Sequence, residues 1–211
     1  MSSLPFMVIK REETLIMKKR TDIIIPVYRP GRSFEKLLEA LCRQTVKPDR
    51  IIVVNTEKRL WDEGDLDKSP FESGNISGIR TVLFHVKKEE FDHGGTRAWA
   101  ADMSDADYLM FMTQAALPAD SHLVETLVNS LETDERIGAV YARQLPLPDC
   151  RFLEKYTRSF NYGEKSRVNS AEDIPVLGVK AFFCSDVCAM YRRSAYDAVG
   201  GFVHKTIFNE D

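Results

Sequence analysis

The chain has 211 residues, of which 44% are apolar and 29% are charged, and its formal net charge is −3. This balance fits one soluble globular domain with a sizeable core and excludes disorder as the main state. The charge shows no clustered basic surplus of the kind that binds nucleic acid. No apolar run approaches the roughly 20 residues that cross a bilayer, so a membrane-spanning protein is excluded, although peripheral membrane association is not.

The N-terminal segment is expected to be an extension rather than part of the core. Its apolar stretch, about five residues, is too short for the apolar region of a signal peptide. Met17 offers a second plausible start directly before the first strand, which sets residues 1–16 apart. We therefore expect an N-terminal extension over residues 1–20 and a single domain over residues 21–211.

The four cysteines give no sign of a metal site. They are Cys42, Cys150, Cys184 and Cys188, and no two of them form a Cys-x-x-Cys pair. A zinc site is therefore weakly supported. The pattern favours reduced cysteines in a cytoplasmic protein.

The first part of the domain predicts a strand, a helix and a second strand. Residues 22–27 (DIIIPV) and 51–54 (IIVV) are continuous apolar runs, typical of strands buried on both faces. Between them, Ser33 is a good N-cap and apolar residues recur with helical spacing at Phe34, Leu37, Leu38 and Leu41. Such a unit of about 35 residues implies parallel strands joined by a right-handed crossover.

The later elements continue the alternation of strands and helices. Strands are expected at 80–86, 108–112 and 137–141, with one or two more within 181–191. Helices are expected at 96–103, after a cap at Asp120 or Ser121, at 152–162 and at 193–199. Residues 57–78 are expected to form a long loop, and residues 163–175 a polar loop that is a candidate mobile lid. The fold class is α/β, with a mostly parallel sheet flanked by helices.

Ligands of open α/β sheets bind at the carboxyl ends of the strands. Three segments are expected there: residues 26–28 (PVY), 55–57 (NTE) and 113–116 (TQAA). A fourth, residues 91–97 (FDHGGTR), precedes a helix, where its glycines and Arg97 would favour an anion. The same residues also fit a plain glycine turn with a surface arginine. A P-loop and a Gly-x-Gly-x-x-Gly turn after the first strand are both excluded by the spacing.

For two further groups of residues, both a structural and a chemical interpretation stay open. His93 fits a hydrogen-bonded structural histidine in a glycine-rich loop as well as a ligand-binding one. Glu210 and Asp211 fit solvated terminal carboxylates as well as an acid/base pair, because a carboxylate can take a proton from a hydroxyl nucleophile.

Several separated motifs resemble a known family in collinear order. The first half supplies TDIIIPVYRP, Gln44-Thr45, IIVVNTE and FDHGGTRAWAADMSDADYLMFMTQAALPAD; the second supplies NYGEKS, LGVKAFFCSDVCAMYRRSAYDAVGGF and TIFNED. Together they resemble inverting glycosyltransferases of family 2, which have the Rossmann-like GT-A fold. Within that family they are similar to the bacterial rhamnosyltransferase branch, whose usual motifs are close to HGGTRN and FLTQDA.

The resemblance implies a nucleotide-sugar donor, dTDP-rhamnose first and a UDP-sugar as the alternative. The sugar would pass with inversion to a hydroxyl of a cell-surface glycan or lipid-linked glycan, in the cytoplasm or at the inner face of the cell membrane. Asp211 matches the general base, and a Mg²⁺ or Mn²⁺ ion is expected for the family. The donor and its nucleotide would contact Pro26, Val27, Tyr28, Asn55, Glu57, His93, Gly94, Gly95, Arg97 and Gln114.

The sequence also departs from the family pattern. Ala115 stands where the branch has its metal-binding aspartate, so no intact metal site is expected. Ala98 replaces an asparagine, and Asn55 replaces the aspartate common in the wider family. The chain stops at the general-base motif, without the family's acceptor-side region, and we expect weak or no transferase activity from this polypeptide.

Two alternatives to an active transferase stay open, and these departures favour the first of them. The first is a degenerate, non-catalytic module that binds a nucleotide sugar or another protein. The second is a nucleotide-binding protein of another α/β class, which would leave the collinear motifs unexplained.

Overall fold

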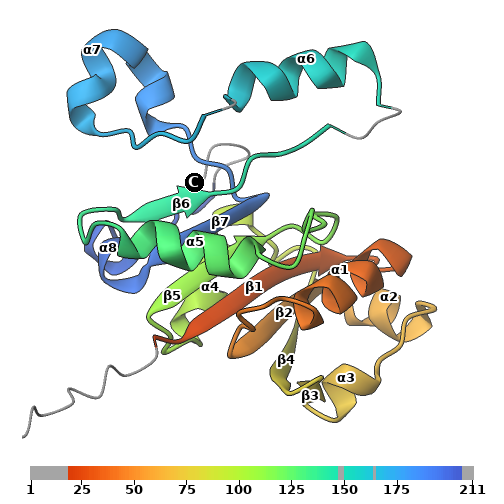
Figure 1. Ribbon diagram of the computed structural model, residues 1–211. Helices are drawn as coiled ribbons and strands as arrows, with labels where there is room; N and C mark the ends of the chain where they lie inside the picture. Colours follow the sequence, from red (N-terminus) through yellow and green to blue (C-terminus); the bar gives the residue numbers. More distant parts are fainter. Residues whose placement is uncertain (1–18, 147–149, 164, 206–211) are drawn as a thin grey trace, which may run out of the picture.

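The computed structural model describes residues 19–146, 150–163 and 165–205, which contain one seven-stranded sheet in the order β3-β4-β2-β1-β5-β7-β6 (Figure 1). Its centre is parallel and consists of β1 (Thr21–Tyr28), β2 (Arg50–Thr56), β4 (Ile79–Val86) and β5 (Tyr108–Met112). Three antiparallel pairings complete it, through β3 (Asn75–Ile76), β6 (Ala139–Tyr141) and β7 (Cys188–Arg192). The predicted α/β class with a mostly parallel sheet is confirmed.

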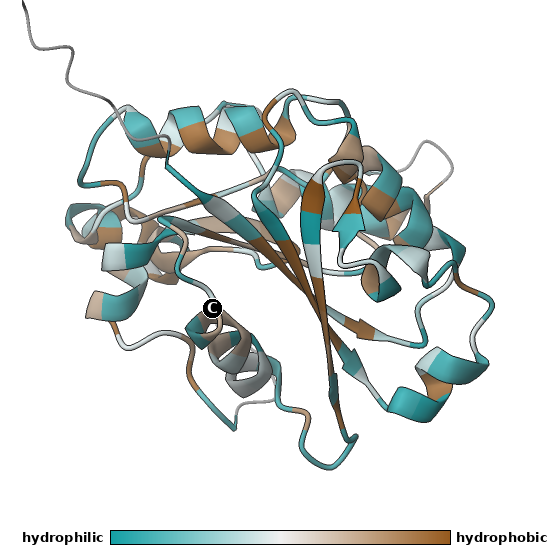
Figure 2. Cartoon of the chain, turned by 90° about the horizontal axis from the view of Figure 1, so that it is seen from below, coloured by the Kyte–Doolittle hydropathy of each residue, from teal (hydrophilic) through white to brown (hydrophobic). Residues whose placement is uncertain are grey.

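Helices cover both faces of the sheet (Figure 1). On one face lie α1 (Arg32–Cys42) and α5 (Leu123–Glu132); on the other lie α4 (His93–Asp102) and α8 (Arg193–Ala198). Alternate residues of β1 serve the two cores, because successive strand side chains point to opposite faces. Ile23 packs in the core that contains Phe34, and Ile24 in the core that contains Ala100. Figure 2 shows the result, with hydrophobic residues concentrated along the central strands.

The first strand–helix–strand unit is confirmed, but its helix α1 begins two residues earlier than expected. The carbonyl of Gly31 accepts hydrogen bonds from the N–H groups of Phe34 (2.9 Å) and Glu35 (3.2 Å), which makes Gly31 the N-cap. Ser33 lies inside the first turn. Similarly, α5 is preceded by His122 rather than capped by Asp120 or Ser121.

The expectation of a long loop at residues 57–78 is wrong. This stretch contains α2 (Lys58–Glu63), α3 (Ser69–Glu72) and β3. Charged residues that looked like loop residues pair along the surface of α2: Lys58 with Asp62 (2.6 Å) and Arg59 with Glu63 (2.9 Å), each four residues apart. Trp61 on its inner side is buried and joins the main core.

The segment between β6 and β7 also differs from expectation. The helix α6 (Phe152–Asn161) is confirmed. The polar loop contains η1 (Ala171–Asp173) and α7 (Ile174–Leu177), and η2 (Gly178–Phe182) occupies the start of the region predicted as strand. The mobility proposed for residues 163–175 stays a prediction. No helix among the residues described is long and apolar enough to cross a bilayer.

Candidate functional site at the carboxyl edge of the sheet

The strand register brings the predicted segments to one edge. Tyr28, Thr56 and Val86, the last residues of β1, β2 and β4, are aligned across the sheet. The loop 113–116 leaves the same edge after β5, which pairs with β1 in parallel. The carboxyl ends of four parallel strands therefore meet where an α/β sheet binds its ligands.

Gln114 connects two of these segments. Its Oε1 accepts a hydrogen bond from the N–H of Tyr28 (2.9 Å), and its Nε2 donates one to the carbonyl of Tyr28 (3.1 Å). The side-chain amide thus imitates a neighbouring strand and extends the β1–β5 ladder by one step. The expected contact of Gln114 with the donor stays a prediction; in the structure both polar atoms of its amide bond to the backbone of Tyr28.

Asn55 is completely buried at the end of β2. Its Nδ2 lies 3.0 Å from Nδ1 of His85, the residue aligned with it on β4. Burial, with a smaller contribution from Lys58, lowers the pKa of His85, so the neutral ring can accept this hydrogen bond. Asn55 Oδ1 has no hydrogen-bond partner among the described residues. A buried amide oxygen without a donor favours a ligand or water that brings an N–H or O–H group.

Glu57 holds the next loop in place. Its N–H donates to the carbonyl of Val86 (2.8 Å), and its Oε1 accepts from the N–H of Lys88 (2.6 Å). Its backbone φ is 68°, a left-handed conformation that is unusual for a residue with a side chain. The carboxylate predicted to face the donor is therefore already bonded to the loop that leads into residues 91–97.

The helix α4 begins at His93, three residues earlier than expected, because Asp92 caps it. Asp92 Oδ1 accepts from the N–H of Gly95 (2.5 Å), and Oδ2 accepts from the N–H of Lys205 (3.0 Å). A Cβ on Gly95 would lie 2.7 Å from that Oδ1, so a side chain there would displace the cap. Asp92 was not among the residues predicted for the site, although an aspartate three residues before a helical N–H is a recognisable cap signal.

Replacing Asp92 with alanine is expected to lower the free energy of unfolding by about 1 kcal/mol, since an N–H at the helix start loses its acceptor. Urea denaturation followed by circular dichroism measures this change. Asp92→Asn keeps an acceptor oxygen for the N–H of Gly95 and loses only the one for Lys205, so it should cost less than the alanine substitution. Equal losses in the two variants would contradict the capping role.

Arg97 is buried and points into the fold. Its Nη1 donates to the carbonyl of His93 (2.8 Å), and its Nε lies 3.9 Å from Oδ2 of Asp186. Asp186 is also buried and accepts a hydrogen bond from the hydroxyl of Tyr191 (2.9 Å). Interpreting this residue as a surface arginine is therefore wrong. The ion pair fastens the first turn of α4 to the segment that enters β7.

Asp186 was not among the residues predicted for the site. A signal was present: it is the single carboxylate in the mostly apolar stretch 181–191, and a charge in such surroundings is expected to have a partner. Nothing local identified that partner as Arg97.

The remaining predicted residues divide by exposure. His93 is exposed, and its ring centroid lies 5.0 Å from that of Phe91. Gly94 is buried, whereas the ring of Tyr28 lies at the surface beneath the guanidinium of Arg29. Pro26 is half-buried, and Val27 is buried in the core. The contact of Val27 with the donor stays a prediction.

The described residues do not fit a divalent metal ion. They contain no cluster of three His, Cys, Asp or Glu residues that could hold one. Ala115 is exposed beside Gln114, and its methyl group offers no oxygen to Mg²⁺ or Mn²⁺. Asp211, the predicted base, and Glu210 lie outside the described residues.

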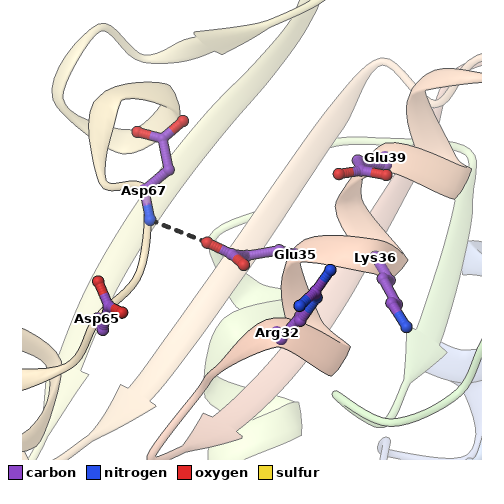
Figure 3. A pocket seen from close by; sticks show the side chains of 6 residues that line it. All are labelled: Arg32, Glu35, Lys36, Glu39, Asp65 and Asp67. Atoms are coloured by element: carbon purple, nitrogen blue, oxygen red, sulfur yellow. Dashed lines mark hydrogen bonds between the residues drawn. The ribbon is translucent and has the colours of Figure 1, made fainter.

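Two hollows in the described surface adjoin the helices. One, of about 510 Å³, separates α1 from the chain after α2 (Figure 3). Glu35 points across it and accepts a hydrogen bond from the N–H of Asp67 (3.1 Å). Four carboxylates and two cations line it, so it does not select an anion: Arg32, Glu35, Lys36, Glu39, Asp65 and Asp67. The other, of about 470 Å³, lies between α4 and α8 and includes Gly95.

Comparison with known proteins shows the family to which this chain belongs. The model of glycosyl transferase family 2 matches residues 22–200. The O-antigen chain rhamnosyltransferase RfbN of Salmonella typhimurium (strain LT2) is 39% identical over 190 residues, and WbaN of Salmonella anatum, of the same description, is 34% identical over 192. Each match covers 90% of this chain and 57% of the relative. The chain belongs to glycosyl transferase family 2 and spans little more than half the length of these relatives.

Solved structures show the same fold. A mannosyltransferase from Pyrobaculum calidifontis, in complex with GDP-Man and Mn²⁺, superposes with a TM-score of 0.59 at 17% identity, over 88% of this chain and 48% of the other. TarS 1–349 of S. aureus, in complex with UDP-GlcNAc, gives 0.58 at 13% identity, over 91% and 51%. The expected GT-A fold is confirmed.

Proposed function

We propose that this chain is the donor-binding part of an inverting glycosyltransferase that transfers rhamnose to a hydroxyl of a cell-surface glycan. The observation that carries the proposal is the carboxyl edge of the sheet, where neighbouring parallel strands end in Tyr28, Asn55 and the loop 113–116. The rhamnosyltransferase relatives support the choice of sugar and of an O-antigen or similar lipid-linked acceptor. A non-catalytic module is the less favoured alternative.

The donor is proposed to be dTDP-rhamnose, with a UDP-sugar as the alternative. Thymine and uracil both carry an imide N–H, and Asn55 Oδ1 is a buried acceptor to which no group of the described residues donates. Satisfying that oxygen would favour such a base. His85 fixes the amide orientation through Nδ2.

In the proposed reaction, the Asp211 carboxylate takes the proton of the acceptor hydroxyl. The hydroxyl oxygen then forms a bond to the anomeric carbon as the bond from that carbon to the diphosphate oxygen breaks on the opposite face, which inverts the centre. Arg97 would act indirectly by holding α4, whose N-terminal end favours negative charge. We place the reaction in the cytoplasm, at the inner face of the membrane.

Ligand-induced thermal stabilisation tests donor binding. At about 100 times its Kd, a ligand adds roughly 2.7 kcal/mol, which raises the melting temperature of a domain of this size by about 5 °C or more. We expect this shift with dTDP-rhamnose or a UDP-sugar and a smaller one with a GDP-sugar. Asn55→Leu should remove most of it, whereas Asn129→Leu, the same change on the exposed side of α5, should not. No shift with any nucleotide sugar would refute the proposal.

Replacing Ala115 with aspartate is expected to strengthen Mn²⁺-dependent binding of the nucleoside diphosphate, because it restores a carboxylate at the family's metal position. The gain should be about tenfold or more, the lower range of effects seen around metal ligands. Isothermal titration calorimetry with and without Mn²⁺ measures it. Leu117→Asp, which adds the same charge to an exposed position nearby, is the control; an equal gain there would leave only nonspecific charge as the cause.

A further inference from the structure

The apolar side of α6 faces solvent, whereas a helix that packs on its own domain turns its apolar side inward. Its bulky apolar side chains face solvent: Phe152 is 82% exposed, Leu153 72%, Tyr156 59% and Phe160 57%. At about 100° per residue, these four positions fall on one stripe roughly 100° wide, the width of a normal buried face. We refer to these four residues as the α6 face. In Figure 1, α6 and α7 stand beyond the sheet, away from the other helices.

The opposite side of α6 attaches to the domain through polar groups. Arg158 donates to Oε1 of Gln144 and pairs with Glu154 (2.9 Å). At the end of the helix, Tyr162 is buried, and its hydroxyl donates to Ser185 (2.9 Å). The ring of Tyr162 also packs edge-on against the rings of Tyr141 and Phe183. The four residues of the α6 face stay at least 57% exposed, and an exposed apolar patch of this kind marks an interaction site.

The charged residues around the α6 face indicate which kind of surface it binds. Lys180 of η2 lies over the ring of Phe160, with Nζ 3.5 Å from its centroid. Arg151 and Lys155 are exposed on α6 or next to it. A second copy of this face would meet like charge, whereas an anionic surface complements it.

We propose that the α6 face lies in the interface of an anionic lipid bilayer, with Phe152, Leu153 and Phe160 among the lipid headgroups and acyl chains and the basic residues on the headgroup phosphates. An amphipathic helix with aromatic and leucine residues on one side and basic residues beside them has the chemistry for this. Residues 142–187 join the carboxyl-edge ends of β6 and β7, aligned at Tyr141 and Ala189. Docking here would bring the candidate site close to the membrane surface.

Vesicle flotation tests this assignment. The full chain should bind vesicles of phosphatidylglycerol and phosphatidylcholine, bind pure phosphatidylcholine at least tenfold more weakly, and lose binding as salt is raised. The double variant Phe152→Ser/Phe160→Ser should reduce binding about tenfold or more while keeping the circular dichroism spectrum. Val199→Ser/Val203→Ser, which changes exposed apolar residues outside α6, is the matched control.

Three results would overturn the proposal. The first is absence of binding to anionic vesicles, and the second is equal binding by the α6 variant and the control. The third is that light scattering shows a dimer of the wild-type chain and a monomer of the α6 variant, while the wild-type chain does not bind vesicles. The last would assign the face to a second copy. Because none of these measurements uses a nucleotide sugar, failure here is distinguishable from failure of the proposed transferase function.

Discussion

Replacing Arg97 with leucine is expected to lower the free energy of unfolding by about 3 kcal/mol, since removing one partner of a buried ion pair leaves the other charge uncompensated. Arg97 and Asp186 are 6% and 5% exposed, so solvent cannot take over the role of the guanidinium. The same substitution also removes the hydrogen bond from Nη1 to the carbonyl of His93. Urea denaturation is the measurement.

The double variant Arg97→Leu/Asp186→Leu separates charge from packing. It removes both charges, and we expect it to recover a large part of the loss, because replacing a buried pair by apolar residues is often neutral or stabilising. Arg193→Leu serves as the control: this arginine bonds backbone carbonyls of Ala101 and Ser104 without a buried carboxylate. A loss below about 1 kcal/mol for Arg97→Leu would show that the pair is not a structural anchor.

Replacing Phe111 with alanine is expected to cost about 3 to 5 kcal/mol, the usual range for a large aromatic residue deleted from a core. Phe111 is fully buried on β5, and the ring centroids of Tyr191, Tyr196 and Phe202 lie 5.7, 6.0 and 4.8 Å away. The cavity cannot close easily, because these rings come from three separate positions around one centre. Thermal and urea unfolding both measure the loss.

Two variants control for this effect. Phe111→Leu keeps most of the volume and should cost less than about 1.5 kcal/mol. Phe160→Ala removes the same atoms from an exposed ring on α6 and should change the free energy of unfolding by less than about 0.5 kcal/mol. Similar losses in the free energy of unfolding for Phe111→Ala and Phe160→Ala would show that Phe111 is not part of the core.

The two variants also bear on the candidate site. Phe111 and Arg97 both connect to the segment around β7: Phe111 pairs with Ala189, and Arg97 contacts Asp186 just before that strand. We expect either substitution to weaken nucleotide-sugar binding as well as stability. The cause would be indirect, because neither side chain is exposed at the carboxyl edge.

Much of the fold was predictable from local pattern. The continuous apolar runs at 22–27 and 51–54 predicted strands covered on both faces, because a strand between two helical layers needs no polar side. The helical spacing from Phe34 to Leu41 predicted the buried side of α1. The motif TQAA predicted the absence of a carboxylate at position 115, which depends on residue identity alone.

Tertiary structure decided the partnerships. Asn55 meets His85 because β2 and β4 are neighbours, Gln114 meets Tyr28 because β1 and β5 are, and Arg97 meets Asp186 because β7 lies beside β5. Helical spacing and apolar runs carry no information on which distant strand becomes a neighbour. Whether Arg97 faces solvent or the core depends on strand order and register, which are set by burial of both faces of the whole sheet at once.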